Sequence, residues 1–299
     1  MGFQSLSLAD QGLFQKFLSL EAHELSVYSF VNIYIWRSLF DIQWKIIDEN
    51  LCVFFQDQTG CFLYLPPFGQ KLSPKAAKDA FKVMDKRNKN RAVSRLENIE
   101  EKDVAALKDL GYRISSKPGE YLCSRKALAG LRGDNFKAKR ACVNYFCKHY
   151  EYRYLEFSPR LKKDCLRLYE LWARERSLGN SDSLYTGMLK DGLVCLQGLF
   201  ADYAKLGLVA RVVEVNGSIK AFTAGFKISP ETFCVLYEFA DLSVKGLSQY
   251  IFRMFCQELE GFKYINIMDD SGLDNLRIVK ESYRPLRLIS AFIADRENE

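Results

Sequence analysis

Two strands predicted in the last third of the chain end in acidic residues. The strands cover about 232–240 and 262–267, and four carboxylates lie at their ends: Glu238, Asp241, Asp269 and Asp270. Ligands of α/β sheets tend to bind at the carboxyl ends of strands. Acyl transfer to an amine or hydroxyl needs a base that removes the proton of the acceptor. The four residues are therefore candidates for a catalytic base, or for holding the cationic amine of an amino acid.

The helix predicted after the second strand would complete this site. Its apolar residues recur at helical spacing: Leu273, Leu276, Val279 and Tyr283. Pro285 ends the pattern. Arg277 and Lys280 would line the helix above the carboxylates, and Tyr283 is a candidate proton donor to the leaving group. Alternatively, the acidic turn only caps the helix, and Arg277 pairs with a neighbouring acid.

A basic stretch with interleaved aromatic residues covers 125–150. It carries a single acid, Asp134, and seven cations: Arg125, Lys126, Arg132, Lys137, Lys139, Arg140 and Lys148. On a helix, the apolar residues would face the core while the charges project outward. Lys139 and Arg140 are candidates for binding a phosphate-bearing donor or an RNA backbone. A solvated linker helix without any ligand explains the same stretch equally well.

Length and composition indicate a packed protein with room for two domains. The chain has 299 residues, of which 48% are hydrophobic, and a formal net charge of +6. No run of about 18 apolar residues occurs, and the first residues lack the layout of a signal peptide. We therefore expect a cytoplasmic protein without stable membrane insertion. The charge is compatible with an anionic ligand or RNA, and no DNA partner is expected.

The cysteines do not form a metal-binding pattern. There are nine of them without a C-x-x-C pair, and the only histidines are His23 and His149. A zinc site is not expected from this set. Reduced, buried thiols explain the cysteines better, because cysteine is a common core residue.

The predicted elements occur twice in the same order. Each half shows a strand meander, a helix, a strand, a second helix and a further strand, with Asn216-Gly217 marking a hairpin in the second meander. This is the order of the GNAT-type N-acyltransferase fold, an α/β fold with a mixed sheet. We predict two tandem GNAT-like domains, over 1–125 and 151–299, joined by a basic linker helix over 126–150.

Three segments resemble the C-terminal catalytic domain family of phosphatidylglycerol lysyltransferases. They are YLCSRKALAGLRG with KAKR within 121–140, LYEFAD at 236–241, and DDSGLDNLRIVKESYRP at 269–285. The resemblance implies a tandem GNAT fold, and membrane-bound relatives use aminoacyl-tRNA as donor and a lipid as acceptor. Ala141 and Phe239 depart from the family's usual Asn and Lys. Because no membrane part is recognised, a lysyl-lipid product is not implied.

The GNAT fold also directs attention to the turn before the helix that starts near residue 247. In ordinary GNAT enzymes, a glycine-rich turn at this place exposes amides to the pyrophosphate of acyl-CoA. The matching residues here are Lys245, Gly246, Leu247 and Ser248, after Val244. They contain one glycine only. Lys245 could supply charge to a donor phosphate.

These observations lead to two hypotheses of different classes. The first is an acyltransferase or aminoacyltransferase that uses aminoacyl-tRNA or acyl-CoA as donor and an amine or hydroxyl as acceptor, through its C-terminal half. The second is a non-catalytic protein that binds a small molecule or RNA on the same fold. No cofactor beyond the donor and no oligomeric state is indicated.

Overall fold

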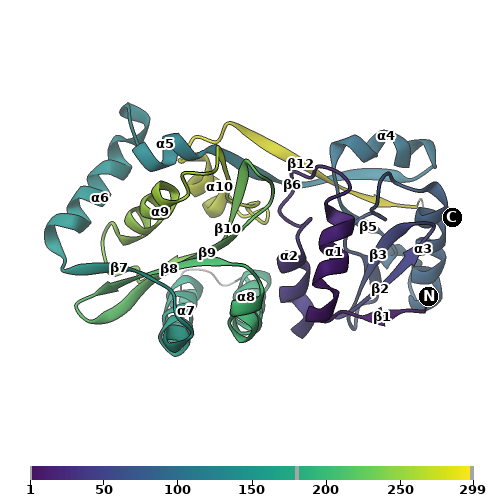
Figure 1. The fold of residues 1–299 in the computed structure, drawn as a ribbon, viewed down its shortest axis with the longest axis horizontal. Coiled ribbons are helices and arrows are strands. Elements are labelled where there is room, and N and C mark those ends of the chain that lie inside the picture. The colour runs from purple at the N-terminus through teal and green to yellow at the C-terminus, as the bar shows by residue number, and fades with distance from the viewer. Residues whose placement is uncertain (1, 179–181, 297–299) are drawn as a thin grey trace. The chain divides into compact units, whose positions relative to one another are not determined.

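The computed structural model describes residues 2–178 and 182–296, and the chain divides into two compact units. Unit 1 comprises Met1–Glu120 and Leu288–Glu299, and unit 2 comprises Tyr121–Arg287. The segment predicted as a linker, 126–150, lies inside unit 2. Most of the final strand, by contrast, belongs to unit 1. The strand and helix labels below are those of Figure 1.

Unit 1 contains a mixed sheet in the order β1-β2-β3-β4-β5-β12-β6. The strands are β1 (Gln4–Ser5), β2 (Asp41–Ile47), β3 (Asn50–Gln56), β4 (Cys61–Leu63), β5 (Leu96–Ile99), β6 (Arg113–Ser124) and β12 (Arg287–Asp295). The helices are α1 (Gln11–Leu18), α2 (Phe30–Ile35), α3 (Pro74–Arg87) and α4 (Glu101–Asp109). The strands β4 and β5, which flank α3, are parallel. In the sequence, Ser73 followed by Pro74 predicts a helix start. The structure confirms it, because the Ser73 side chain accepts the Ala76 N–H and Pro74 is the first residue of α3.

Unit 2 contains the order β6-β11-β10-β9-β8-β7. Its own strands are β7 (Tyr152–Glu156), β8 (Val209–Val215), β9 (Ser218–Lys227), β10 (Thr232–Ala240) and β11 (Tyr264–Asn266). Its helices are α5 (Arg125–Gly130), α6 (Lys137–His149), α7 (Lys162–Leu178), α8 (Ser183–Asp202), α9 (Leu247–Glu258) and α10 (Asp274–Glu281). Helices α5, α6 and α9 cover one face of the sheet, and α7 and α8 cover the other (Figure 1). The predicted hairpin between β8 and β9 is confirmed, with positive φ at Asn216 and Gly217.

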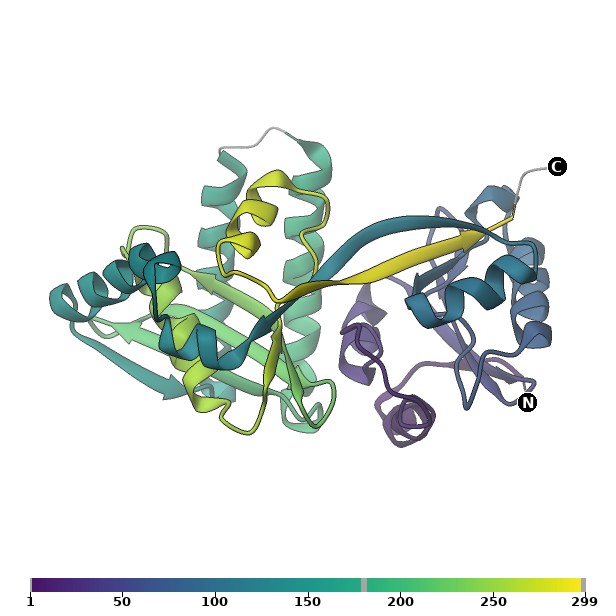
Figure 2. The same ribbon diagram turned by 90° about the horizontal axis from the view of Figure 1, so that it is seen from above.

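Each unit includes a strand from the other half of the chain. In unit 2, β11 pairs with the end of β6, where Ile265 lies opposite Cys123. In unit 1, β5 pairs with β12, where Ile99 lies opposite Phe292. Figure 2 shows β6 and β12 as two long neighbouring strands. Strand β12, from the end of the chain, thus completes the sheet of unit 1. The end of β6, from the first half of the chain, completes the sheet of unit 2.

The sequence also predicts a short strand near 91–95 and a strand pair at 112–116 and 120–124, and the structure contradicts both. A strand predicted near 91–95 begins only at Leu96, because Asn90 caps a short 3-10 turn over Arg91–Val93. A strand pair predicted at 112–116 and 120–124 is one continuous strand, β6. Gly119 lies inside this strand, and β12 passes close to it. A side chain would not fit there, because a Cβ at Gly119 would come within 2.7 Å of the Ile289 carbonyl oxygen.

Gly246 is the point where α6 and α9 meet closely. It precedes α9 with φ +84°, and a Cβ there would lie 2.1 Å from the carbonyl oxygen of Cys142 on α6. Phe146 of α6 closes the same contact and belongs to a core cluster with Leu247 and Ile251 of α9. The glycine is therefore required for helix packing.

We predict that Gly246→Ala destabilises the protein by about 3 kcal/mol or more, because a clash with backbone is added to the strain of a positive φ. The matched control is Gly217→Ala, whose φ is +77° and whose Cβ would meet nothing within 4 Å. It should cost about 1 to 2 kcal/mol, from backbone strain alone. Urea unfolding of both variants measures the difference, and equal losses would show that the α6 contact does not constrain this turn.

Candidate active site

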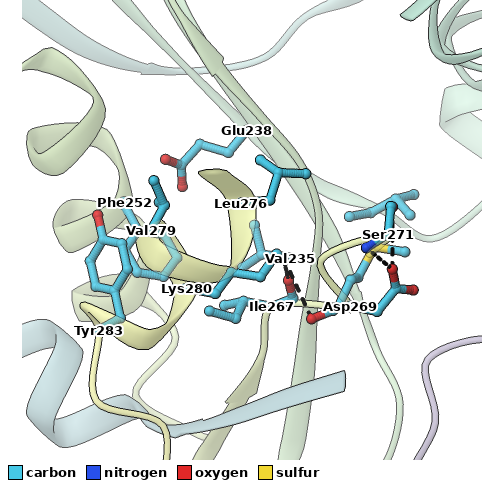
Figure 3. A pocket seen from close by; sticks show the side chains of 12 residues that line it. Val235, Glu238, Phe252, Ile267, Asp269, Ser271, Leu276, Val279, Lys280 and Tyr283 are labelled. Carbon is cyan, nitrogen blue, oxygen red and sulfur yellow. Dashed lines mark hydrogen bonds between the residues drawn. The ribbon is translucent and has the colours of Figure 1, made fainter. Parts of the chain in front are cut away.

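A cavity of about 340 Å³ opens in unit 2 where β10 and β11 part. The two parallel strands pair from Thr232 with Tyr264 to Cys234 with Asn266, where β11 ends. Strand β10 continues to Ala240 and carries a bulge against β9 between Val235 and Tyr237. Helices α9 and α10 and the turn after β11 close the cavity (Figure 3). Such a parting of parallel strands exposes side chains at the carboxyl ends of a sheet.

Glu238 is the acidic group at the inner end of this cavity. It stands on the part of β10 beyond the last β11 pair and is half-buried. Among the described residues, none donates a hydrogen bond to its carboxylate. Burial raises the pKa of Glu238 to about 8, although the charges of Lys280 and Lys139 lower it. A carboxyl group with such a pKa exchanges a proton near neutral pH.

Two lysines from distant parts of the chain face Glu238. Lys280 of α10 lines the cavity and donates to the carbonyl oxygen of Ile267, with the Met268 carbonyl oxygen 3.5 Å from its Nζ. Lys139 of α6 donates to Ser282 Oγ over 2.7 Å. Burial lowers the pKa of Lys139 to about 8, and the negative charge of Glu238 opposes this shift. The carboxyl and the two amines thus form one electrostatic group.

Tyr283 joins this group from the residues after α10. Its ring is buried, lies edge-on to Phe252, and has the Lys139 Nζ 3.5 Å from its centroid. Burial and the charge of Glu238 raise the pKa of Tyr283 well above its usual value. The hydroxyl therefore keeps its proton. In Figure 3 the hydroxyl of Tyr283 and the carboxyl of Glu238 lie at the same end of the cavity.

The acidic turn after β11 forms the opposite end. Asp269 lines the cavity, and its Oδ1 accepts the Ser271 N–H at 2.6 Å and the Ser271 hydroxyl at 3.3 Å. Asp270 is buried outside the lining and accepts the Tyr121 hydroxyl at 2.7 Å and the Gly272 N–H at 2.9 Å. Asp270 thus shapes the turn, and Asp269 is presented to the cavity.

The predicted carboxylate set is therefore divided by the structure. Glu238 and Asp269 line the cavity, and Asp270 supports it. Asp241 instead accepts Lys220 Nζ at 2.7 Å and the Ser243 N–H at 2.9 Å, and caps the turn before α9. Asp241 does not line this cavity.

The predicted donor-binding residues are divided as well. The charges of Lys139 and Lys280 both act on Glu238. Arg140 donates to the carbonyl oxygens of Leu131 and Gly133, between α5 and α6, and Arg277 pairs with Asp274 at the exposed side of α10. That pairing is the alternative that the sequence left open for Arg277.

The turn before α9 lies away from the cavity lining. Lys245 is exposed, and its Nζ is 4.5 Å from the centroid of the Tyr145 ring. Gly246 is packed against α6, Leu247 is fully buried in the core, and Ser248 is half-buried. The single glycine of this turn thus has a packing reason that needs no phosphate.

Sequence reasoning missed the apolar lining of the cavity. It comprises Val235, Leu236, Phe252, Ile267, Met268, Leu276 and Val279. The helical spacing of Leu276 and Val279 was a correct signal for an apolar face. That face lines the cavity, and Val279 stays 51% exposed.

The family described as phosphatidylglycerol lysyltransferase, C-terminal, matches residues 19–295. The chain belongs to this family. The predicted resemblance is therefore confirmed, and the family supports a protein of the acyl- or aminoacyltransferase type. A search of curated proteins found no match.

Solved structures agree with this family assignment. A conserved protein of unknown function from Bacteroides thetaiotaomicron is 26% identical, with a TM-score of 0.87 over 98% of this chain and 99% of that one. L-PGS from Bacillus licheniformis is 18% identical, with a TM-score of 0.66 over 97% and 93% of the two chains. A tandem GNAT protein from the clavulanic acid biosynthesis pathway is 9% identical, with a TM-score of 0.57 over 100% and 99%. The predicted tandem GNAT fold is confirmed.

Two further features are absent from the described residues of this family member. No helix there is long and apolar enough to cross a membrane. Across residues 2–178 and 182–296, no three His, Cys, Asp or Glu side chains gather as a metal ion would require.

We predict that Tyr121→Phe loosens the acidic turn and costs about 2 kcal/mol of stability, because the buried Asp270 carboxylate loses a hydrogen-bond donor. Hydrogen exchange of the Gly272 amide and thermal unfolding measure the effect. Tyr264→Phe on β11 is the control, since no described residue bonds its hydroxyl. If the two variants show the same amide exchange and the same thermal stability, Asp270 does not shape the turn.

Proposed function

We propose that this protein transfers an acyl or aminoacyl group from an activated donor to an amine or hydroxyl acceptor, in the cavity between β10 and α10. The observation that carries the proposal is the Glu238 carboxyl. It is half-buried without a hydrogen-bond donor among the described residues and is faced by Lys139 and Lys280. Structural ion pairs are usually hydrogen-bonded directly. A carboxyl left open toward a cavity suits a group that exchanges protons with a ligand.

The transfer step can be written with these residues. Glu238 takes the proton of the acceptor as its nitrogen or oxygen bonds to the donor carbonyl carbon. Lys139 and Lys280 lie on the same side as Glu238 and stabilise the negative charge that develops on the carbonyl oxygen. The bond to the leaving oxygen or sulfur then breaks, and that atom takes a proton from Tyr283. Transfer of the Glu238 proton to Tyr283 restores both residues.

The donor is an aminoacyl ester or an acyl thioester in this proposal. The family name supports the aminoacyl donor, because lysyl transfer is an aminoacyl transfer. The fold supports either donor. Asp269, at the far end of the cavity, favours the aminoacyl donor, since its carboxylate is placed to hold an α-ammonium group.

The proposal is tested by incubating the protein with labelled aminoacyl-tRNA or acyl-CoA and a cell extract that supplies acceptors. Transfer should exceed that of a Glu238→Ala/Asp269→Ala double variant. If no donor gives transfer above that variant, the enzyme function is wrong, and a binding protein on the same fold takes its place.

We predict that Glu238→Gln lowers kcat/KM by about 100-fold or more, because the amide cannot accept the acceptor proton. Glu231→Gln is the matched control. Glu231 precedes the same strand, is exposed and pairs with Lys263 outside the cavity. This control should retain full activity. An unchanged rate for Glu238→Gln would exclude Glu238 as the base.

The pH dependence of kcat/KM should be bell-shaped with its maximum near pH 8. Below this pH, Glu238 is protonated and cannot act as base, because its pKa is raised to about 8. Above it, Lys139 loses its charge, because its pKa is lowered to about 8. Because Glu238 and Lys139 interact, each limb of the profile reports the titration of the pair and not of one residue.

The variant Lys139→Arg should keep activity at high pH, because arginine stays charged. Rates measured from pH 6 to 10 separate the two limbs. A rising limb that persists unchanged in Glu238→Gln would contradict the assignment of this limb to Glu238.

A further inference from the structure

We propose that Ser282 is a positioning residue, which holds the ammonium group of Lys139 against the ring of Tyr283 for the transfer step. The inference rests on the proposed transfer function and concerns the same site. Ser282 does not line the cavity and acts through Lys139. Two observations carry the inference: the pair of hydrogen bonds made by the Ser282 hydroxyl, and the uncharged partners of Lys139.

The Ser282 hydroxyl has a fixed orientation. Ser282 follows the last residue of α10, and its Oγ donates to the carbonyl oxygen of Val279 over 2.5 Å. A hydroxyl has one proton to donate and two lone pairs that accept. Because the proton points to Val279, the lone pairs are left for a donor. Lys139 Nζ donates to them over 2.7 Å, so the hydrogen bonds run from Lys139 through Ser282 to the last turn of α10.

The end of α10 is a favourable place for this cation. The carbonyl groups of the last helical turn have no amide partner within the helix, and they carry a partial negative charge. The Val279 carbonyl belongs to this turn. Lys139 comes from the first turn of α6, a helix that is distant in the sequence. Ser282 thus connects a lysine of one helix to the C-terminal end of another.

The residue after Ser282 supplies the second contact to the same ammonium group. Lys139 Nζ lies 3.5 Å from the centroid of the Tyr283 ring, which is a cation–π contact. The Tyr283 ring is buried and packs edge-on against Phe252. The backbone is also fixed here, because the Ser282 N–H donates to the Ile278 carbonyl oxygen over 3.1 Å. The hydroxyl and the ring therefore hold the ammonium group at a defined place.

Both of these partners are uncharged. Among the described residues, no carboxylate accepts a hydrogen bond from Lys139. Glu238 acts on Lys139 through its charge, and the other titratable or charged groups that act on it are Cys142 and Arg284. A lysine bonded directly to Glu238 would occupy the carboxylate that the acceptor must reach. Ser282 keeps the cation in the site and leaves the carboxylate of Glu238 open.

The chain offers a matched control for the loss of this hydroxyl. Ser282→Ala removes the hydroxyl, and Ser282→Thr keeps it. Ser19 also follows the last residue of a helix, α1, and its Oγ donates to the carbonyl oxygen of Lys16, three residues earlier, over 2.9 Å. None of the residues that the structure describes donates to the Ser19 hydroxyl. Ser19→Ala therefore removes the same bond at a helix end without affecting a lysine.

The first measurement is an NMR titration of the full chain labelled with ¹³C-lysine, in which the Lys139 signal is assigned by its loss in Lys139→Arg. In Ser282→Ala the charged form of Lys139 loses an acceptor, so the midpoint of its titration should fall by about one pH unit. Ser282→Thr and Ser19→Ala should titrate like the wild-type protein. An unchanged midpoint in Ser282→Ala would overturn the inference, and this result needs no substrate.

The pH profile of transfer distinguishes positioning from a merely structural role. In Ser282→Ala, kcat/KM should be about tenfold below the wild-type value at pH 9 and nearly unchanged at pH 6, because Lys139 stays charged at low pH. The same loss at every pH would show a structural role only and would overturn the inference. A wild-type profile would refute the positioning role and leave the transfer function standing. No transfer by the wild-type protein from any aminoacyl or acyl donor would refute the transfer function, and the role of Ser282 would fall with it.

Discussion

The separation of two parallel strands is the constraint on which the site depends. β11 stops at Asn266 after pairing with only the first residues of β10, and β10 continues. The backbone edge and side chains beyond that point would be exposed if α10 did not lie over them. Lys280 secures this arrangement by donating to the Ile267 carbonyl at the end of β11. The same lysine thus satisfies a strand end and places a positive charge beside Glu238.

The electrostatic balance at Glu238 follows from this geometry. One carboxyl and two amines share a site with limited water, so burial disfavours the charged form of each group, while their attraction favours charge. The opposite shifts of the pKa values of Glu238 and Lys139 express this competition.

Local features of the fold could be predicted from the sequence, because they depend on neighbouring residues. Asn216-Gly217 formed the expected hairpin, Ser73-Pro74 began a helix, and the stretch 262–285 formed a strand, an acidic turn and a helix. The repeated order of the predicted elements indicated the tandem fold, and the family resemblance agreed with it. Long-range features could not be predicted, because the spacing of residues along the chain does not show which segments pack together.

The site illustrates this limit. The sequence singled out Lys139 and Glu238 separately, and only the packing of α6 against α9 and α10 places them together. The sequence also made Asp241 and Lys245 candidates for the site. Both lie in the turn before α9, where Asp241 accepts a hydrogen bond from Lys220 and Lys245 lies against the Tyr145 ring. The apolar face of α10 was visible in the sequence. Periodicity alone could not show whether that face covered a core or lined a cavity.

The exchange of strands between the two halves has a consequence for the order in which the protein folds during synthesis. Strand β12 lies between β5 and β6 in the sheet of unit 1, yet it is made after all of unit 2. Until then the edge of β5 is unpaired, and an open strand edge favours association with other chains. The sheet of unit 1 is therefore completed only after unit 2 has been made, and we expect neither half of the chain to fold well as a separate fragment.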